Sequence, residues 1–409
     1  MGVASIEEQV TALMRGSEFG DDQIKAIMTQ ELRQRLTEAR QEGRPLRVYC
    51  GYDVTAPDIH LGHTITMRKL RQFQEFGHEV TFLIGTFTTL IGDPSDRDTG
   101  RAQAQLEHIM RNAETYADQA FRILDRKKTL VKYNYDWLSK LSFGDVLGLA
   151  SHFTVQQLLA RDRIRNRMDR NDPISLREFL YPLGQGYDAV ALQADVQLGA
   201  TEQLFNLMAG RKLQEVFGQK PQICLTFPVL VGTDGEMRMS KSTGNYIGVS
   251  EAPENIFGKI MSIPDKLILH YFLLLTNTPQ PELNEFQKCM DAGENPMELK
   301  KRLGREIVTE LYDATAATEA EAHFAKVVQN KEVPNNIPTL VVTEAEPDVR
   351  RLLVDNNYLA SMSEATRLIK QGGVKIDGEK LTAFNAPLKD GSVIQAGKRL
   401  FVKIERTGN

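Results

Sequence analysis

The fold is decided by the stretch Leu46-Arg47-Val48-Tyr49-Cys50-Gly51-Tyr52 together with His60-Leu61-Gly62-His63, which follows it closely. The first run is mostly apolar and predicts a buried strand. The second opens a segment, Thr64 to Phe76, whose apolar residues recur at helical spacing. A strand that leads into a helix through glycine-containing sequence brings free backbone N–H groups and the positive end of the helix to one point. We therefore expect a polyphosphate site here, with the imidazoles of His60 and His63 one turn apart as donors.

A second motif, Arg238-Met239-Ser240-Lys241-Ser242, lies far beyond the first in the chain. It places the cation of Lys241 among hydroxyl groups, in a stretch between Gly235 and Gly244 with little apolar periodicity. Such a stretch predicts a lysine that moves onto a departing pyrophosphate, as adenylate transfer requires. Together the two motifs indicate a protein that handles a nucleotide. The alternatives are a capped helix start or a metal pair for the histidines, and an exposed loop lysine for Lys241.

Strand-like and helical stretches alternate from residue 46 to about residue 235. The expected strands are Leu46–Tyr52, Val80–Ile84, Thr129–Asn134, Leu192–Leu198 and Ile223–Val231. This alternation predicts an α/β domain, in which a parallel sheet carries helices on both faces. Ligands of such sheets bind beyond the C-terminal ends of the strands, and His60 and His63 follow one of these ends.

Helical patterns flank this alternating region. Residues 1–44 predict a polar helical segment, and the helices expected after residue 250 are Ile256–Met261, Lys266–Leu275, Pro296–Asp313 and Thr318–Val328. The last helix is expected to begin at Thr318, because Glu321 would complete a capping box with it. The Pro- and Asn-containing stretch Glu332–Pro338 predicts a linker.

The composition is that of an ordinary globular protein, with 409 residues of which 41% are hydrophobic and 25% charged. These values exclude disordered, collagen-like and disulfide-rich proteins, and the length allows two or three domains. The cysteines, Cys50, Cys224 and Cys289, lack CxxC spacing, which fits a reducing compartment and excludes a cysteine-based zinc site. No apolar run is long enough to span a membrane and no signal peptide is evident, so we expect a cytoplasmic location.

Charge is distributed unevenly along the chain. The net charge is −4, yet residues 349–409 hold eleven Lys and Arg against six acidic residues, an excess of +5 that leaves −9 for the rest. A basic tail on an acidic body predicts an anionic partner at that end. An ordinary solvated surface is the alternative.

These motifs resemble those of the bacterial tyrosyl-tRNA synthetases, which are class I aminoacyl-tRNA synthetases, over essentially the whole chain. The class I signatures usually written HIGH and KMSKS appear here as His60–His63 and Arg238–Ser242. Four further segments resemble the tyrosyl family, in the correct order: Tyr49–Pro57, Leu90–Ser95, Tyr181–Asp188 and Leu198–Gln203.

The resemblance implies three domains. A Rossmann-like parallel-sheet catalytic domain is expected at 1–245, including the helical segment 1–44, and a helical anticodon-side domain at 246–331. A linker at 332–345 would lead to a small α+β RNA-binding domain at 346–409, similar to the fold first known from a small-subunit ribosomal protein. In that domain Arg367 and Lys370 share one helix face, and Lys375 follows on a short strand. Such a surface contacts phosphates and RNA shape.

The resemblance also implies a pocket for free tyrosine. The tyrosine hydroxyl would be held by Tyr49 and Asp188. Phenylalanine has no hydroxyl to satisfy these two groups, and enzymes of this type are known to reject it. The residues expected around the rest of the amino acid are Asp93, Tyr181 and Gln185 at its ammonium, and Gln203 nearby. Tyr181, Gln185 and Asp188 fall on one helix face by their spacing. A solvated polar stripe is the alternative.

For ATP, the resemblance implies contacts around both signatures. Ribose contacts are expected from Cys50, Gly51, His63 and Glu202, phosphate contacts from Thr55 and His60, and further ATP contacts from Asp53, Gly62 and Gly199. Lys241 with Arg238 would hold the departing pyrophosphate. The expected catalytic residues are therefore Thr55, His60, His63, Arg238 and Lys241. They would act by positioning and charge stabilisation, because the carboxylate of tyrosine itself attacks the α-phosphorus. Mg²⁺ would arrive on the ATP phosphates, and no tightly bound protein metal is expected.

The implied activity is tyrosine–tRNA ligation, with L-tyrosine, ATP and tRNA(Tyr) as partners and a homodimer as the family's usual assembly. The sequence departs from the family pattern at Glu202, where aspartate is more usual, so its ribose contact would span one more methylene. Leu204 stands where many members have tryptophan, and Ala200 replaces a glycine.

Three alternatives are open. A small-molecule nucleotidylyltransferase shares the HxGH chemistry but needs neither an RNA-binding tail nor a tyrosine pocket. A tryptophanyl synthetase is a nearer relative, against which the pair Tyr49 and Asp188 argues. A non-catalytic RNA-binding protein derived from a synthetase is the third, and the intact His60, His63 and Lys241 argue against it.

Overall fold

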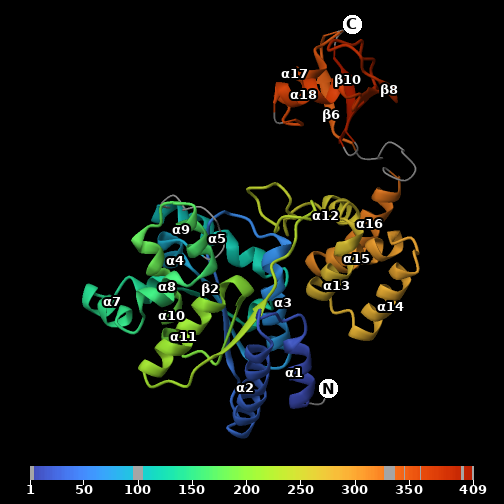
Figure 1. Ribbon diagram of the computed structural model, residues 1–409. Helices are drawn as coiled ribbons and strands as arrows, with labels where there is room; N and C mark the ends of the chain where they lie inside the picture. The colour runs from blue at the N-terminus through green and yellow to red at the C-terminus, as the bar shows by residue number, and fades with distance from the viewer. Residues whose placement is uncertain are drawn as a thin grey trace. The chain divides into compact units, whose positions relative to one another are not determined.

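The computed structural model describes residues 4–94, 105–326, 337–344, 346–359, 361–397 and 400–407. Its contacts divide the chain into two compact units, Met1–Ala314 and Thr315–Asn409. Each unit contains one five-stranded sheet. Figure 1 follows the chain from its N-terminus in blue to its C-terminus in red.

The first unit is built on a parallel sheet. Its strands are β1 (Arg47–Tyr52), β2 (Glu79–Ile84), β3 (Thr129–Tyr133), β4 (Val196–Ala200) and β5 (Ile223–Phe227). They lie in the order β3-β2-β1-β4-β5, and every neighbouring pair is parallel. From β1 the chain continues outward to β2 and β3, and from β4 it continues in the opposite direction to β5. The direction of winding therefore reverses between β1 and β4. The predicted α/β class is confirmed, and the reversal marks the crevice where such sheets bind ligands.

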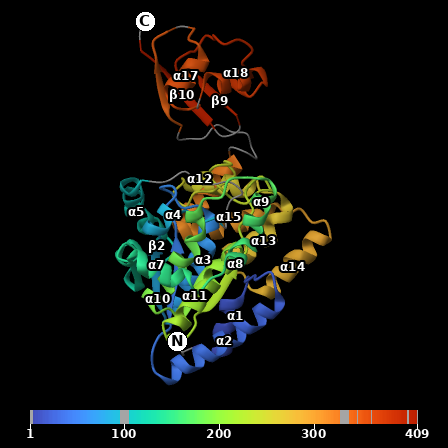
Figure 2. The same cartoon turned by 60° about the vertical axis from the view of Figure 1, so that its left-hand side comes forward.

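Helices cover both faces of this sheet. α3 (Leu61–Glu75) connects β1 to β2, and α11 (Leu204–Val216) connects β4 to β5. Because both crossovers are right-handed but run in opposite directions, the two helices lie on opposite faces. α3 packs against β1, β2 and β4, whereas α11 packs against β4, β5 and α10 (Tyr181–Leu192). α10 and α11 lie side by side in Figure 1 and Figure 2.

The remaining helices of this unit precede, interrupt and follow the sheet. α1 (Ile6–Met14) and α2 (Asp22–Gln41) come first. Between β2 and α10 are α4 (Thr86–Ile91), α5 (Leu106–Ala120), α6 (Tyr135–Leu138), α7 (Phe143–Ala150), α8 (Val155–Leu159) and α9 (Asp162–Asp169). After β5 come α12 (Pro253–Met261), α13 (Ile268–Leu275), α14 (Gln280–Asp291) and α15 (Met297–Leu311).

Several boundaries differ from those predicted. The strand expected at Leu192–Leu198 is wrong at its start, because α10 runs to Leu192 and Gln193 then turns the chain at φ 47°. The strand expected to end at Val231 ends at Phe227, because Pro228 has no N–H for the sheet. Thr318 is not a helix cap, because α16 (Ala314–Phe324) begins a turn earlier. Ser95, Val328 and part of the predicted linker, 332–336 and 345, lie outside the described residues.

After α16, the second unit has a small mixed sheet and two short helices. Its strands are β6 (Thr339–Val342), β7 (Val374–Ile376), β8 (Glu379–Lys380), β9 (Val393–Ala396) and β10 (Leu400–Arg406), in the order β6-β10-β9-β7-β8. α17 (Val349–Asp355) and α18 (Met362–Lys370) precede β7. Val349, Leu353, Ile369 and Val402 join the helices to the sheet in one buried cluster. This is the α+β fold predicted for the C-terminal part.

Candidate active site

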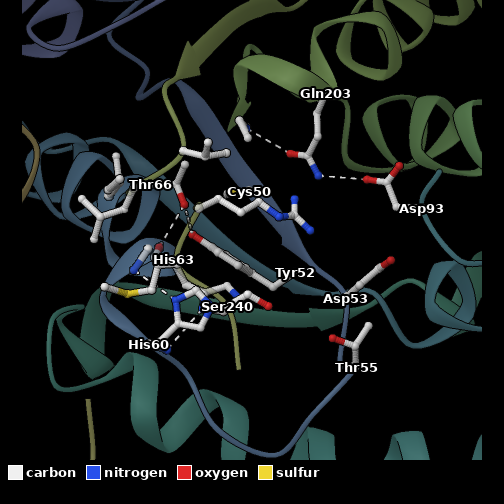
Figure 3. A pocket seen from close by; sticks show the side chains of 18 of the residues that line it. Cys50, Tyr52, Asp53, Thr55, His60, His63, Thr66, Asp93, Gln203 and Ser240 are labelled. Carbon is white, nitrogen blue, oxygen red and sulfur yellow. Dashed lines mark hydrogen bonds between the residues drawn. The ribbon is translucent and has the colours of Figure 1, made fainter. Parts of the chain in front are cut away.

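A cavity of about 420 Å³ opens at the crevice between β1 and β4. The end of β1, the end of β4, the start of α3 and the loop carrying Arg238 and Lys241 all line it. Figure 3 looks into the cavity. The predicted residues that line it are Cys50, Gly51, Asp53, Thr55, His60, Gly62, His63, Asp93, Tyr181, Gly199, Gln203, Arg238 and Lys241. The structure therefore brings both signatures and most of the predicted site to one place.

His60 and His63 hold each other at the start of α3. His60 is the N-cap residue, and its Nδ1 accepts the backbone N–H of Gly62 at 3.1 Å. Nδ1 of His63 accepts the N–H of His60 at 3.2 Å, and the ring centroids lie 3.9 Å apart. A Cβ at Gly62 would lie 2.9 Å from the His60 ring, so this position leaves no room for a side chain. Since both Nδ1 atoms accept, the neutral rings carry their protons on Nε2.

The electrostatic surroundings keep His60 neutral. Burial, together with the nearby His63, Lys241 and Arg238, lowers its pKa to about 2. The Nε2–H group is then an uncharged donor at any working pH. The positive charge of the cavity must therefore come from the loop cations Arg238 and Lys241.

The predicted free backbone N–H groups at the start of α3 are not found. The N–H of Leu61 donates to the carbonyl of Ile247 at 2.9 Å, and the N–H of His63 donates to the carbonyl of His60 at 2.9 Å. Gly62 donates to the His60 ring. Because these first amides are used within the protein, the imidazole Nε2–H groups are the donors that this helix start offers.

The loop with the second signature is braced internally by Asn245. Its Oδ1 accepts the N–H of Ser240 at 2.8 Å, while its Nδ2 donates to Asp234 at 2.7 Å and to the carbonyl of Arg238 at 3.1 Å. Lys241 Nζ donates to the carbonyl oxygen of Asp58 at 2.5 Å and lies 3.5 Å from the Asp58 carboxylate. Burial lowers the pKa of Lys241. Both loop cations thus reach the cavity from a defined backbone.

Glu202 forms ion pairs with arginines. Its Oε1 lies 2.5 Å from Arg163 and its Oε2 3.4 Å from Arg238. It is not among the described residues that line the cavity. The expected ribose contact of Glu202 therefore competes with two cations for the same carboxylate.

Asp93 and Gln203 face each other across the cavity wall, as Figure 3 shows. Gln203 Nε2 donates to Asp93 at 3.1 Å, and Gln203 Oε1 accepts the N–H of Ala200 at 3.0 Å. The N–H of Ala200 therefore fixes which way the Gln203 amide points. A buried carboxylate at this position is suited to an ammonium group.

A chain of buried polar side chains starts at the cavity. The hydroxyl of Tyr181 donates to Asp53 at 3.1 Å, and Thr88 Oγ1 donates to the other Asp53 oxygen at 2.7 Å. Gly85 lies against this pair, since a Cβ there would be 2.4 Å from Asp53 and 2.5 Å from Thr88. The absence of a side chain at Gly85 thus leaves space for Asp53, which follows β1, and for Thr88 on α4.

The chain continues to Asp188 deeper in the protein. Asn134 Nδ2 donates to Thr88 Oγ1 at 3.0 Å and to Asp188 Oδ2 at 3.1 Å, and Trp137 Nε1 donates to Asp188 Oδ1 at 2.8 Å. Asp188 is 2% exposed, and this burial raises the pKa of its carboxyl to about 8. Each oxygen of this buried carboxyl thus has one side-chain donor.

Tyr49 and Gln185 lie near Asp188 with unsatisfied polar atoms. The Tyr49 hydroxyl and Gln185 Oε1 are buried and have no hydrogen-bond partner. The Asp188 charge, together with burial, raises the pKa of Tyr49 well above its usual value. Tyr49, Gln185 and Asp188 are not among the described residues that line the cavity. Buried atoms without partners are costly, so this end of the site suits a ligand with a hydroxyl.

Sequence reasoning missed Asp58, Thr88, Asn134 and Trp137. Asn134 ends a predicted strand, and a polar residue in that position is a usable signal. Trp137 is the single tryptophan of the chain and lies directly after it, yet nothing in the spacing joins either residue to Asp188.

The predicted RNA-binding residues lie on a helix and a strand of the second unit. Arg367 and Lys370 are exposed on α18, and Lys375 is half-buried on β7. A shallow hollow on α18 is lined by Met362, Ser363, Thr366, Arg367, Lys370 and Gln371. The two cations thus flank a polar surface.

Within the described residues, no group of three His, Cys, Asp or Glu side chains is arranged to hold a metal ion. Nor does any described helix combine the length and the apolar character needed to cross a membrane.

Two family models match the chain. The model described as tRNA synthetases class I (W and Y) matches residues 41–329. The S4 domain model matches residues 353–394.

Among curated proteins, a tyrosine–tRNA ligase of Geobacter sulfurreducens is 46% identical over 405 residues, 98% of this chain and 99% of that protein. One of Carboxydothermus hydrogenoformans is 45% identical and covers 99% of both chains. Among solved structures, a tyrosyl-tRNA synthetase of Archaeoglobus fulgidus complexed with L-tyrosine aligns with a TM-score of 0.60 and 24% identity, covering 76% of this chain and 99% of that chain. This structural likeness concerns the fold.

Proposed function

The chain belongs to the class I tyrosyl-tRNA synthetases and is a tyrosine–tRNA ligase, and from this premise we propose how its residues divide the work. Its substrates are tyrosine, ATP and tRNA. Ligation proceeds by formation of tyrosyl-adenylate and pyrophosphate, followed by transfer of the tyrosyl group to the terminal adenosine of tRNA.

The observation that carries the proposal is the unsatisfied hydroxyl of Tyr49 near Asp188. This hydroxyl is buried without a hydrogen-bond partner, and the charge of Asp188 helps to raise its pKa. A substrate phenol inserted here would donate to Asp188 and accept from Tyr49. Phenylalanine would leave the Tyr49 hydroxyl unsatisfied, which is the physical basis of rejection.

At the other end of tyrosine, the ammonium would meet Asp93, with Tyr181 and Gln185 around it and Gln203 fixing the Asp93 carboxylate. The polar chain through Asp53 connects this end with the hydroxyl end. Both ends of the substrate would then bind to groups that are already positioned.

ATP would occupy the cavity between the two signatures. Ribose would lie at the ends of β1 and β4, beside Cys50, Gly51, Asp53 and Gly199. Glu202 would contact the ribose only by giving up an ion pair with an arginine. A Cβ at Gly199 would lie 2.9 Å from Leu207 and 3.1 Å from Gln203 Oε1, so the glycine leaves room for these two side chains at the strand end. Thr55 and the Nε2–H groups of His60 and His63 would donate to phosphate or ribose oxygens, with Gly62 making room for the rings.

The chemical step needs no protein nucleophile. The tyrosine carboxylate attacks the α-phosphorus, a new C–O–P linkage forms, and pyrophosphate leaves with its electron pair. Lys241 and Arg238 would stabilise the negative charge that grows on the leaving group. Mg²⁺ would enter on the ATP phosphates and neutralise part of the same charge.

For tRNA we propose that Arg367, Lys370 and Lys375 contact the phosphate backbone. Their support is that Arg367 and Lys370 are exposed on α18, and Lys375 half-exposed on β7, in a unit that matches the S4 domain model. We keep the division into a catalytic domain at 1–245, a helical domain at 246–331, a linker at 332–345 and an RNA-binding domain at 346–409.

A homodimer in the cytoplasm is the proposed assembly and location. The strongly exposed large apolar side chains of the first unit include Phe143 (78%), Leu147 (55%), Val155 (66%) and Leu176 (78%). Such exposure is characteristic of an interaction surface. Sedimentation of the wild type and of Phe143→Glu tests it, and the variant should shift toward monomer.

Tyrosine-dependent exchange of pyrophosphate into ATP tests the proposed function. Exchange should require tyrosine and should not be supported by phenylalanine or tryptophan. Absence of exchange with every amino acid would favour an RNA-binding protein without catalysis.

A further inference from the structure

Two acidic residues hold the loop with Arg238 and Lys241. Lys241 Nζ donates to the carbonyl oxygen of Asp58 at 2.5 Å and lies 3.5 Å from its carboxylate, and Arg238 lies 3.4 Å from the Glu202 carboxylate. Both cations line the cavity and, under the proposed function, act on phosphates. In the structure, carboxylates are paired with the two cations that phosphates would otherwise contact.

Asp58 belongs to a rigid part of the wall. The carbonyl of Pro57 accepts from Gln119 Nε2 at 2.7 Å, and the N–H of Ile59 donates to Gln119 Oε1 at 2.8 Å. One side chain of α5 therefore clamps both neighbours of Asp58. Because the segment is fixed, its carboxylate is an anchor rather than a group that follows the loop.

Glu202 is likewise fixed from behind. Arg163 on α9 binds its Oε1 at 2.5 Å and leaves Oε2 directed to Arg238 at 3.4 Å. The Arg238 contact is longer than the Arg163 contact. A stronger anion, such as a triphosphate, can thus take Arg238 without dismantling the Arg163–Glu202 pair.

We propose that Asp58 is a positioning residue: with Glu202 as second anchor, its carbonyl oxygen and its carboxylate together hold the Lys241 loop over the cavity until the ATP phosphates replace them, and the carboxylate supplies the charge of this contact. The proposal rests on the proposed function, in that the replacing anion is the triphosphate. Before ATP arrives, the anchors keep the loop ordered and both cations paired. ATP binding must break the ion pair of Lys241, so the anchor weakens ATP binding in the ground state while it shortens the path to the transition state.

The test compares Asp58→Asn with Asp58→Glu, which keeps the charge, and with Glu254→Gln, which removes one charge from an exposed position on α12. Limited trypsin digestion of the full chain, without substrates, cuts after Arg238 and Lys241 when the loop is released. Asp58→Asn should be cut about two- to fivefold faster than wild type, the range for a partly exposed ion pair. Glu254→Gln should match wild type, and Asp58→Glu should lie between.

Exchange kinetics give the second readout. Asp58→Asn should lower KM for ATP by a similar factor and leave KM for tyrosine unchanged, a split that a general loss of structure would not produce. Unchanged cleavage in Asp58→Asn, or a raised KM for ATP, would overturn the proposal. Wild type without tyrosine-dependent exchange would refute the proposed function instead, because the digestion needs no substrate.

Discussion

The amide of Asn134 donates to the carboxyl of Asp188 across 3.1 Å and at the same time to Thr88 across 3.0 Å. Through Thr88, this side chain joins Asp188, which is proposed to bind the tyrosine hydroxyl, to Asp53, which is proposed to bind ATP. Asn134 is fully buried, so this junction is insulated from water. The two ends of the site are therefore held by one polar network.

Replacing Asn134 with Ala should lower kcat/KM for tyrosine in the exchange reaction. The variant leaves Asp188 with one donor fewer, at a cost of about 1–3 kcal/mol, or roughly tenfold or more in kcat/KM. Asn112→Ala is the matched control, because Asn112 is also buried but lies on α5 outside the network. Equal losses in both variants would mean that Asn134 contributes only to packing.

Tyrosine affinity should rise with pH between 6 and about 8 and then level off. Burial raises the pKa of Asp188 to about 8, so below this pH the empty site holds a protonated carboxyl. A phenol that donates to Asp188 favours the ionised form, so binding must release a proton and weakens by up to about tenfold per pH unit below pH 8. Equilibrium dialysis at several pH values measures this, and Asp188→Asn should give a flat profile. A wild-type profile as flat as that of the variant would contradict the assignment.

Lys241→Ala should slow adenylate formation far more than it weakens tyrosine binding. The ammonium is expected to act on charge that grows on pyrophosphate, so its removal affects the transition state. Pre-steady-state measurement of the rate constant and of the tyrosine dissociation constant separates the two effects. Equal losses in both would assign Lys241 to ground-state binding.

Charge removal on α18 should separate the two half-reactions. Arg367→Gln with Lys370→Gln should retain exchange and lose most tRNA charging, because only the second step needs the RNA surface. Wild-type tRNA affinity should also fall as salt rises. Lys389→Gln, a single change elsewhere in the same unit, is the control. Undiminished charging by the double variant would mean that these cations are an ordinary solvated surface.

A protein that ends near Pro338 should behave in the same direction. The residues proposed for tyrosine and ATP all precede residue 245, and the first unit has its own sheet and core. Exchange should persist in the truncated protein, while transfer to tRNA should be lost. Full charging by it would place tRNA binding in the first unit.

The sheet could be predicted because its strands are short, buried apolar runs, which sequence displays directly. Gln193 shows where this fails: its left-handed turn lets α10 continue to Leu192, and apolar residues alone do not distinguish a helix end from a strand start. Thr318 had the local pattern of a cap, but the preceding turn at Ala314 was already helical.

The site divides in the same way. His60, His63 and Lys241 stand in compact motifs, so their meeting in one cavity could be predicted. The state of the backbone amides at the start of α3 could not be predicted, because the amide of Leu61 donates to the carbonyl of Ile247, which is remote in sequence. The partners of Asp188 were missed for the same reason, since a buried hydrogen bond depends on tertiary contacts that spacing does not contain.

The most direct test of the account is the tyrosine-to-phenylalanine ratio of kcat/KM in the exchange reaction, measured for wild type and Asp188→Asn. Asparagine keeps the shape of the side chain but removes the ionised acceptor that only tyrosine uses. The account predicts that the variant loses at least about tenfold in kcat/KM for tyrosine. Its kcat/KM for phenylalanine should change little, so the ratio falls. An unchanged kcat/KM for tyrosine in Asp188→Asn would contradict the claim that this buried carboxyl selects the substrate hydroxyl.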